Sequence, residues 1–179
     1  MSAGALLGAL RLGDSAFPSG AFAFSNGLET LAEEGASPAD AEAMLTGQVA
    51  PRWLDFDRWF LAAAHAAAPD PDAVAAIDAD CEARNAVAAL AAASRRTGRA
   101  GLTTHARLGT AGAADYLARV KAGDAPGHAA VAQGLAAKAL GLPLAEAEAA
   151  AFHGVLAGWA SAAVRLGLMG ALDAQGMVA

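Results

Sequence analysis

Four histidines are the residues of this sequence best suited to bind a metal ion: His65, His105, His128 and His153. A metal site built within one segment places two or more His, Cys or acidic ligands at a short, regular spacing. None of the four has a second such residue at a spacing that builds a site by itself. We therefore predict no metal site. A small metal-dependent hydrolase stays open as an alternative, which requires the four side chains to converge in the fold.

The single cysteine is the thiol that could act as a nucleophile. Cys81 lies between Asp80 and Glu82, and neighbouring carboxylates disfavour the reactive thiolate. Asp78, Asp80 and Glu82 themselves are predicted to form a solvated helix face. The chain has no G-x-x-x-x-G-K-[ST] phosphate loop and no G-x-S-x-G nucleophile elbow. We predict no catalytic residue and no cofactor site, so the protein is not expected to be an enzyme.

The chain carries few charges. Hydrophobic residues make up 56% of the 179 residues and charged residues 17%, so weakly polar surfaces are expected, some of them covered by partners. The net charge of −6 argues against nucleic acid as a partner. Arg95, Arg96 and Arg99 form a tight basic cluster, predicted to lie on a solvated helix face. One cysteine and the absence of a secretory signal pattern favour the cytoplasm.

Apolar residues recur at spacings of three and four, and strand-like alternation is nearly absent. This pattern predicts an all-α protein, a single-domain compact bundle (residues 1–179) of roughly eight to ten helices. The expected helices are Ala5–Leu12, Leu28 to Gly35, Pro38 to Ala67 with a kink at Pro51, a helix through Val74 and Ile77, Cys81–Leu108, Tyr116–Val120, a helix from Gly127 to Leu140, and Leu144–Gly167.

Local sequence patterns predict where some of these helices begin or end. Asn26 is a predicted N-cap, with Glu29 as its capping partner three residues later. Ser37-Pro38 followed by Asp40 predicts a second helix start, with a serine cap, proline in the first turn and an early acid. Gly141 predicts a helix stop, because glycine tolerates the left-handed conformation found there.

The segment Ala149–Val164 carries no charge apart from that of His153. It is shorter than the ~20 residues that a membrane span needs, so we predict a buried helix and no membrane partner. Phe152 and Trp159 follow helical spacing on one side, and small residues on another side allow close packing. The helix is therefore expected at the centre of the bundle.

The segment Asp14–Glu29 combines aromatic residues with Pro18 and Gly20. Proline restricts itself and the residue before it, and glycine permits a turn, so an irregular loop is predicted. Loops are usually polar because they lie on the surface. A loop this aromatic is either buried between helices or offered to another protein.

Three stretches carry a resemblance to a known family. The run Leu6–Glu29, ending S-N-G-L-E, resembles the opening of the urease accessory protein UreF. The later motifs are S-A-A-V-R-L-G (Ser161–Gly167) and A-L-D-A-Q (Ala171–Gln175), and Gly127–Gly141 resembles the family's penultimate helix region. The family usually continues with a further helix and tail, which we expect to be absent from this chain.

The resemblance implies an all-helical, non-enzymatic protein that helps load nickel into urease. It implies binding to a UreD-type (UreH) accessory protein, to the GTPase UreG and to apo-urease, as a homodimer, with influence on GTP hydrolysis. Nickel and GTP would enter through these partners alone.

The resemblance also implies partner-binding residues. Glu29 and Arg165 would face the GTPase. Helix capping by Glu29, and a favourable interaction of Arg165 with the helix dipole, are simpler explanations that stay open. The other implied partner-binding residues are Phe17, Phe22, Phe24 and Asn26 in the aromatic loop, and Gln175. A bundle that binds an apolar ligand is a further alternative, which would need a closed cavity of ~300 Å³ or more.

Overall fold

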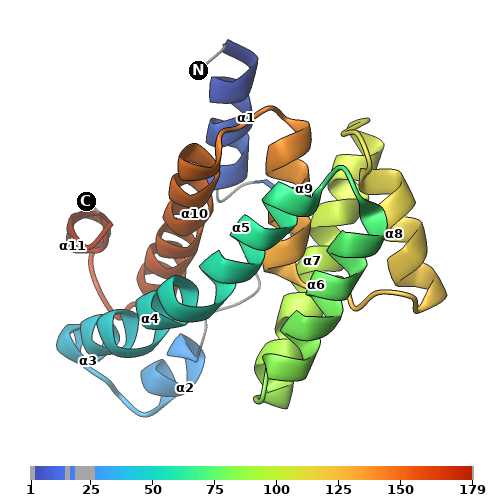
Figure 1. The fold of residues 1–179 in the computed structure, drawn as a ribbon. Coiled ribbons are helices and arrows are strands. Elements are labelled where there is room, and N and C mark those ends of the chain that lie inside the picture. The colour runs from blue at the N-terminus through green and yellow to red at the C-terminus, as the bar shows by residue number, and fades with distance from the viewer. Residues whose placement is uncertain (1–2, 15–16, 19–26, 179) are drawn as a thin grey trace.

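The structure is a computed structural model that describes residues 3–14, 17–18 and 27–178. Every regular element within these ranges is helical, so the predicted all-α class is confirmed (Figure 1). In chain order the elements are α1 (Ala3–Gly13), α2 (Leu28–Glu33), α3 (Pro38–Met44), the π-helical η2 (Leu45–Val49), α4 (Ala50–Arg52), the π-helical η3 (Trp53–Asp57), α5 (Arg58–Ala67), α6 (Pro71–Arg84), α7 (Ala88–Arg107), α8 (Ala113–Ala122), α9 (Ala129–Ala139), α10 (Leu144–Arg165) and α11 (Ala171–Gly176).

The start of α3 forms as its local sequence predicts. The Ser37 hydroxyl accepts a hydrogen bond from the Asp40 backbone N–H, and the Asp40 carboxylate accepts one from the Ser37 backbone N–H at 2.8 Å. This capping box satisfies backbone donors that a helix start leaves unpaired. All of its partners lie within four residues, which is why sequence alone predicts it.

The helix that begins at Pro38 continues through Pro51. Proline has no backbone N–H and its ring crowds the preceding turn, so a kink or split was expected there. The chain widens into π turns on both sides of it, η2 before Pro51 and η3 after it, and such turns are themselves a common cause of helix kinks. These wide turns accommodate the proline within one helical run that ends at Ala67.

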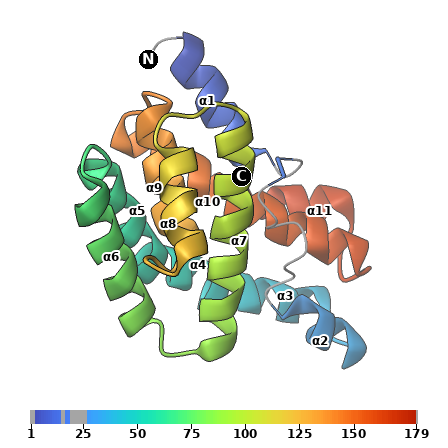
Figure 2. The same cartoon turned by 90° about the vertical axis from the view of Figure 1, so that its right-hand side faces the viewer.

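The predicted helix Cys81–Leu108 is wrong, because the chain breaks between α6 and α7. Asn85 takes φ −84° and ψ 75°, and its side-chain oxygen accepts a hydrogen bond from Arg52 Nη1 at 3.3 Å. Figure 2 shows α6 and α7 running in opposite directions from this connection. The partner that holds the break lies 33 residues away, so local sequence gave no signal of it.

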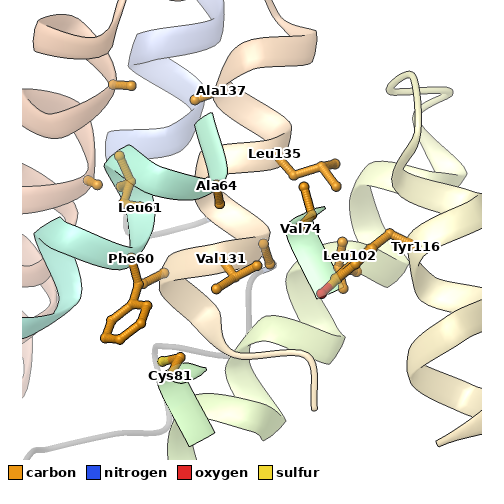
Figure 3. Packing of buried hydrophobic residues seen from close by; sticks show 14 of the residues in the cluster. Phe60, Leu61, Ala64, Val74, Cys81, Leu102, Tyr116, Val131, Leu135 and Ala137 are labelled. Carbon is orange, nitrogen blue, oxygen red and sulfur yellow. The ribbon is translucent and has the colours of Figure 1, made fainter. Parts of the chain in front are cut away.

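The centre of the bundle is α9, and not α10 as the sequence suggested. Helix α9 packs against α5, α6, α7, α10 and α1. Its Gly134 lies so close to α5 that an added Cβ would be 2.3 Å from the Leu61 carbonyl oxygen. Figure 3 shows Val131, Leu135 and neighbouring side chains in the main core. Helix α10 contacts several helices, as expected, but from one side of the bundle.

A second hydrophobic cluster, here called the second core, joins the early helices to the C-terminal end of the described chain. Its buried members are Leu28, Ala41, Leu45, Val49, Trp159, Ala160, Ala162, Ala163, Leu168, Met169 and Ala174. Figures 1 and 2 both place α2, α3 and α11 at the same end of the bundle, beside α10.

Candidate partner-binding surface

Glu29 is an exposed residue in the first turn of α2, next to the fully buried Leu28. The N-cap of α2 is Gly27, with φ 96°, and no side chain caps the helix start. Asn26 as N-cap with Glu29 as its capping partner is therefore wrong. The left-handed conformation of Gly27 replaces a capping residue here, and an added Cβ would contact Met44 at 2.8 Å. Glu29 still complements the positive helix start electrostatically.

Arg165 is the last residue of α10 and is exposed. The helix ends there, two residues before the predicted end, because Gly167 takes φ 72° and Leu168 N–H donates to the Ala163 carbonyl. This glycine-based stop is a common helix terminus. A cation in the last turn also complements the negative end of the helix dipole, so Arg165 stabilises the end of α10.

Glu29, Arg165 and Gln175 lie on helices that share the second core. Each is exposed, and each lies within two residues in the sequence of a buried member of that cluster: Leu28, Ala163 and Ala174 respectively. Glu29 and Gln175, which are 146 positions apart in the sequence, thus lie on helices that pack in the same hydrophobic cluster. We call these three side chains, with the helices that carry them, the α2–α10–α11 surface.

Phe17 lies elsewhere, against α7. Its ring is half-buried, with its centroid 5.2 Å from that of His105. The neighbouring Pro18 carbonyl accepts a hydrogen bond from Thr104 Oγ1 at 2.8 Å. These contacts anchor the start of the aromatic loop to α7. Phe22, Phe24 and Asn26 lie outside the described residues.

The four histidines are held by separate partners. His65 Nε2 lies 2.7 Å from the Leu142 carbonyl oxygen, and His105 Nδ1 lies 3.0 Å from Thr110 Oγ1. His128 bonds to Glu82 and Ser94, and His153 is exposed beside Gly13. Within residues 3–14, 17–18 and 27–178, no group of three His, Cys, Asp or Glu side chains could hold a metal ion.

A Ser–His–Glu chain of hydrogen bonds does form, from Ser94 through His128 to Glu82. Ser94 Oγ lies 3.1 Å from His128 Nδ1, and Glu82 Oε2 lies 2.7 Å from His128 Nε2. The same hydroxyl accepts the Ala129 backbone N–H at 3.2 Å, and His128 has no exposed surface. His128 is within hydrogen-bond reach of the serine, as a nucleophilic site requires, but it is fully buried, so no substrate can approach it from solvent. The Ser94 hydroxyl instead caps the start of α9.

Asp78 completes this cap and was wrongly predicted to lie on a solvated face. It is fully buried, and its carboxylate accepts hydrogen bonds from Tyr116 Oη and from the backbone N–H groups of Gly127 and His128. Three donors compensate the loss of hydration of this buried carboxylate. Sequence reasoning missed it because its partners lie 38 to 50 residues away.

Cys81 is buried in the main core. Burial, followed by the nearby carboxylates Asp57 and Asp78, raises the pKa of the Cys81 thiol to about 12. A thiol with so high a pKa is a poor nucleophile at neutral pH.

The described residues form an all-α bundle. Its exposed candidate residues Glu29, Arg165 and Gln175 lie near helix ends, on helices that pack in the second core. Among the described helices, none is both long and apolar enough to cross a membrane.

A comparison with models of protein families matches UreF over residues 36–179. The chain therefore belongs to the UreF family, whose members are urease accessory proteins. The match contains Arg165 and Gln175 and begins after Glu29 and the aromatic loop. No curated protein sequence matches the chain.

Proposed function

We propose that this chain is a scaffold of urease maturation that joins a UreD/UreH-type protein to the GTPase UreG for nickel insertion into apo-urease. It acts in the cytoplasm, as a homodimer within that complex. The scaffold binds neither nickel nor GTP itself and modulates GTP hydrolysis by UreG. Family membership supports the accessory role, and the partners are our proposal.

The α2–α10–α11 surface is the observation that carries this proposal. A docking surface needs side chains that are exposed to a partner and fixed in position before it arrives. Glu29 and Arg165 are both exposed, and both lie on helices whose buried residues pack in the second core. Apolar side chains on α1, such as Leu7 and Leu10, both 63% exposed, offer further area that another chain would cover.

The test is co-purification of the chain with UreD/UreH-type protein and UreG. Arg165→Glu is expected to weaken UreG retention about tenfold, because it replaces the cation proposed to contact UreG with an anion. The melting temperature should fall by only about 2–4 °C, since an exposed helix-end charge contributes little stability. Arg107→Glu, an exposed arginine at the end of α7, is the matched control.

Unchanged UreG retention by Arg165→Glu would remove Arg165 from the proposed interface. An equal loss with Arg107→Glu would show a general charge effect and contradict the proposed site. Glu29→Gln tests the modulation: the rate of GTP hydrolysis per UreG retained in the assembled complex should change.

A further inference from the structure

Helix α7 carries a surface pocket whose described lining includes no residue of α2, α10 or α11. Its volume is about 640 Å³. The described residues that line it include Arg95, Arg96, Arg99 and Thr103, and none of them is an aspartate or glutamate. Glu82 pairs with Arg95 and offsets one of these charges, so the three arginines leave a local excess of positive charge in a chain with a net charge of −6. We call this pocket the α7 basic pocket.

One wall of the pocket is fixed in advance. Arg95 Nη1 donates to Glu82 Oε2 at 2.6 Å, and the same Glu82 oxygen lies 2.7 Å from Nε2 of the fully buried His128. A guanidinium has five N–H donors in a rigid fork, so donors on its other nitrogens remain for a ligand. Because Arg95 is held before binding, less side-chain entropy is lost when a ligand arrives.

The position of the pocket along α7 decides which groups of the protein can contact a ligand. Arg95 to Thr103 lie inside a helix of 20 residues, so the backbone N–H groups there are bonded within the helix. Phosphate sites generally use free backbone N–H groups at helix starts or in turns. Here side chains alone would bind. Arg95 and Arg99 are four residues apart and lie above one another, with Arg96 about 100° around the helix.

We propose that the α7 basic pocket binds an acidic segment of a partner protein, with separate Asp or Glu carboxylates on Arg99 and on the remaining donors of Arg95. Arginine pairs with carboxylates through two parallel hydrogen bonds, which suits spaced acidic side chains. A single small anion would contact a minor part of a pocket this large. The inference does not depend on which urease accessory protein supplies the segment.

The test uses a short fluorescein-labelled peptide of alternating glutamate and serine, with binding followed by fluorescence anisotropy at low salt. Thr103→Glu places a carboxylate one turn after Arg99, inside the pocket, and should weaken binding about tenfold. Thr103→Gln has nearly the same size without the charge and should stay within about twofold of the unaltered chain. Glutamate and glutamine both favour helix, and circular dichroism checks that α7 is kept.

Equal affinity of Thr103→Glu and Thr103→Gln for the peptide would overturn the proposal. So would an equal loss with Arg107→Glu, which lowers the net charge outside the pocket, because binding would then reflect overall charge. Displacement of the peptide by inorganic phosphate, at concentrations where acetate has no effect, would assign the pocket to phosphate groups and also overturn it.

Discussion

At the scale of single residues, His105 links the start of the aromatic loop to α7. Its ring lies against Phe17, and Thr110 Oγ1 is 3.0 Å from Nδ1. Burial, followed by the positive charge of Arg11, lowers the pKa of His105 below its ordinary value. The folded state therefore favours the neutral ring, and protonation favours unfolding.

This lowered pKa predicts a stability that falls as the pH drops below about 6.5, where an unfolded histidine takes up its proton. The fall should end below the folded pKa, where both states are protonated. Urea unfolding of the unaltered chain and of His105→Gln at a series of pH values measures it. The difference between the two free energies of unfolding should depend on pH in this window. A constant difference would contradict the prediction.

Trp159 gives a second prediction at this scale. It is fully buried in the second core, and within the described residues its Nε1 has no hydrogen-bond partner. An unpaired buried N–H costs about 1–3 kcal/mol, so Trp159→Phe should change the free energy of unfolding by only about 1 kcal/mol. Trp159→Ala removes the whole ring and should cost about 3–5 kcal/mol. Denaturant titration measures both, and equal losses would contradict the prediction.

Whether a residue's contacts could be predicted depends on how far away in the sequence its hydrogen-bond partners lie. The Ser37–Asp40 capping box could be predicted because its groups lie three residues apart. The burial of Asp78 could not, since its donors come from α8 and from the start of α9. Its acidic neighbours Asp80 and Glu82 made a solvated face the natural expectation.

At the scale of elements, helix α7 contains a matched pair of glycines. An added Cβ at Gly98 would lie 2.1 Å from the Gly127 carbonyl oxygen, whereas nothing lies within 4 Å of one at Gly101. Gly98→Ala should therefore destabilise the protein by about 1–3 kcal/mol or more, because α7 and the start of α9 must move apart. Gly101→Ala should stabilise it by about 0.5–1 kcal/mol through helix propensity.

Thermal unfolding of the two variants checks this pair. Both substitutions are identical in chemistry and lie in one helix, so a difference in sign isolates the helix contact. Equal effects would mean that α7 and α9 do not approach as closely as the structure shows.

The central place of α9 could have been inferred from its own composition. Ala129–Ala139 carries Gln133 and Lys138 as its polar side chains, and a helix apolar nearly all round is generally buried. The bulky residues of α10 drew the prediction there instead. Small residues mark the centre of this bundle, because they allow backbones to approach.

At the scale of the whole molecule, two cores meet along α10, where Val155 packs against both. The smaller second core supports the proposed docking surface, so stability and partner binding should be coupled through it. Leu28→Ala, at a fully buried site, should cost about 2–5 kcal/mol and also reduce UreG retention. Paired measurements of melting temperature and co-purification check this. A destabilised variant that retains UreG fully would separate the second core from binding.

The fold class followed from apolar spacing, and the family from motifs near both ends of the chain. The arrangement of the helices did not follow, because it depends on contacts such as Gly134 with Leu61. For the candidate site, Glu29 and Arg165 are exposed, and their role at an interface stays a prediction. The α7 basic pocket was not predicted. Arg95, Arg96 and Arg99 were expected on a solvated helix face, because the sequence shows their charge but not the hollow beside them.

The wide turns around Pro51 have a consequence for how this helical run tolerates changes in length. A π turn spans one more residue than an α turn for each hydrogen bond, so η2 and η3 each carry a surplus. Removing a single amino acid near Gly47, where the backbone faces open space, would let η2 tighten into an ordinary α turn. The side chains beyond it would then keep their register with α9, whereas the same deletion within α5 would rotate its whole buried face away.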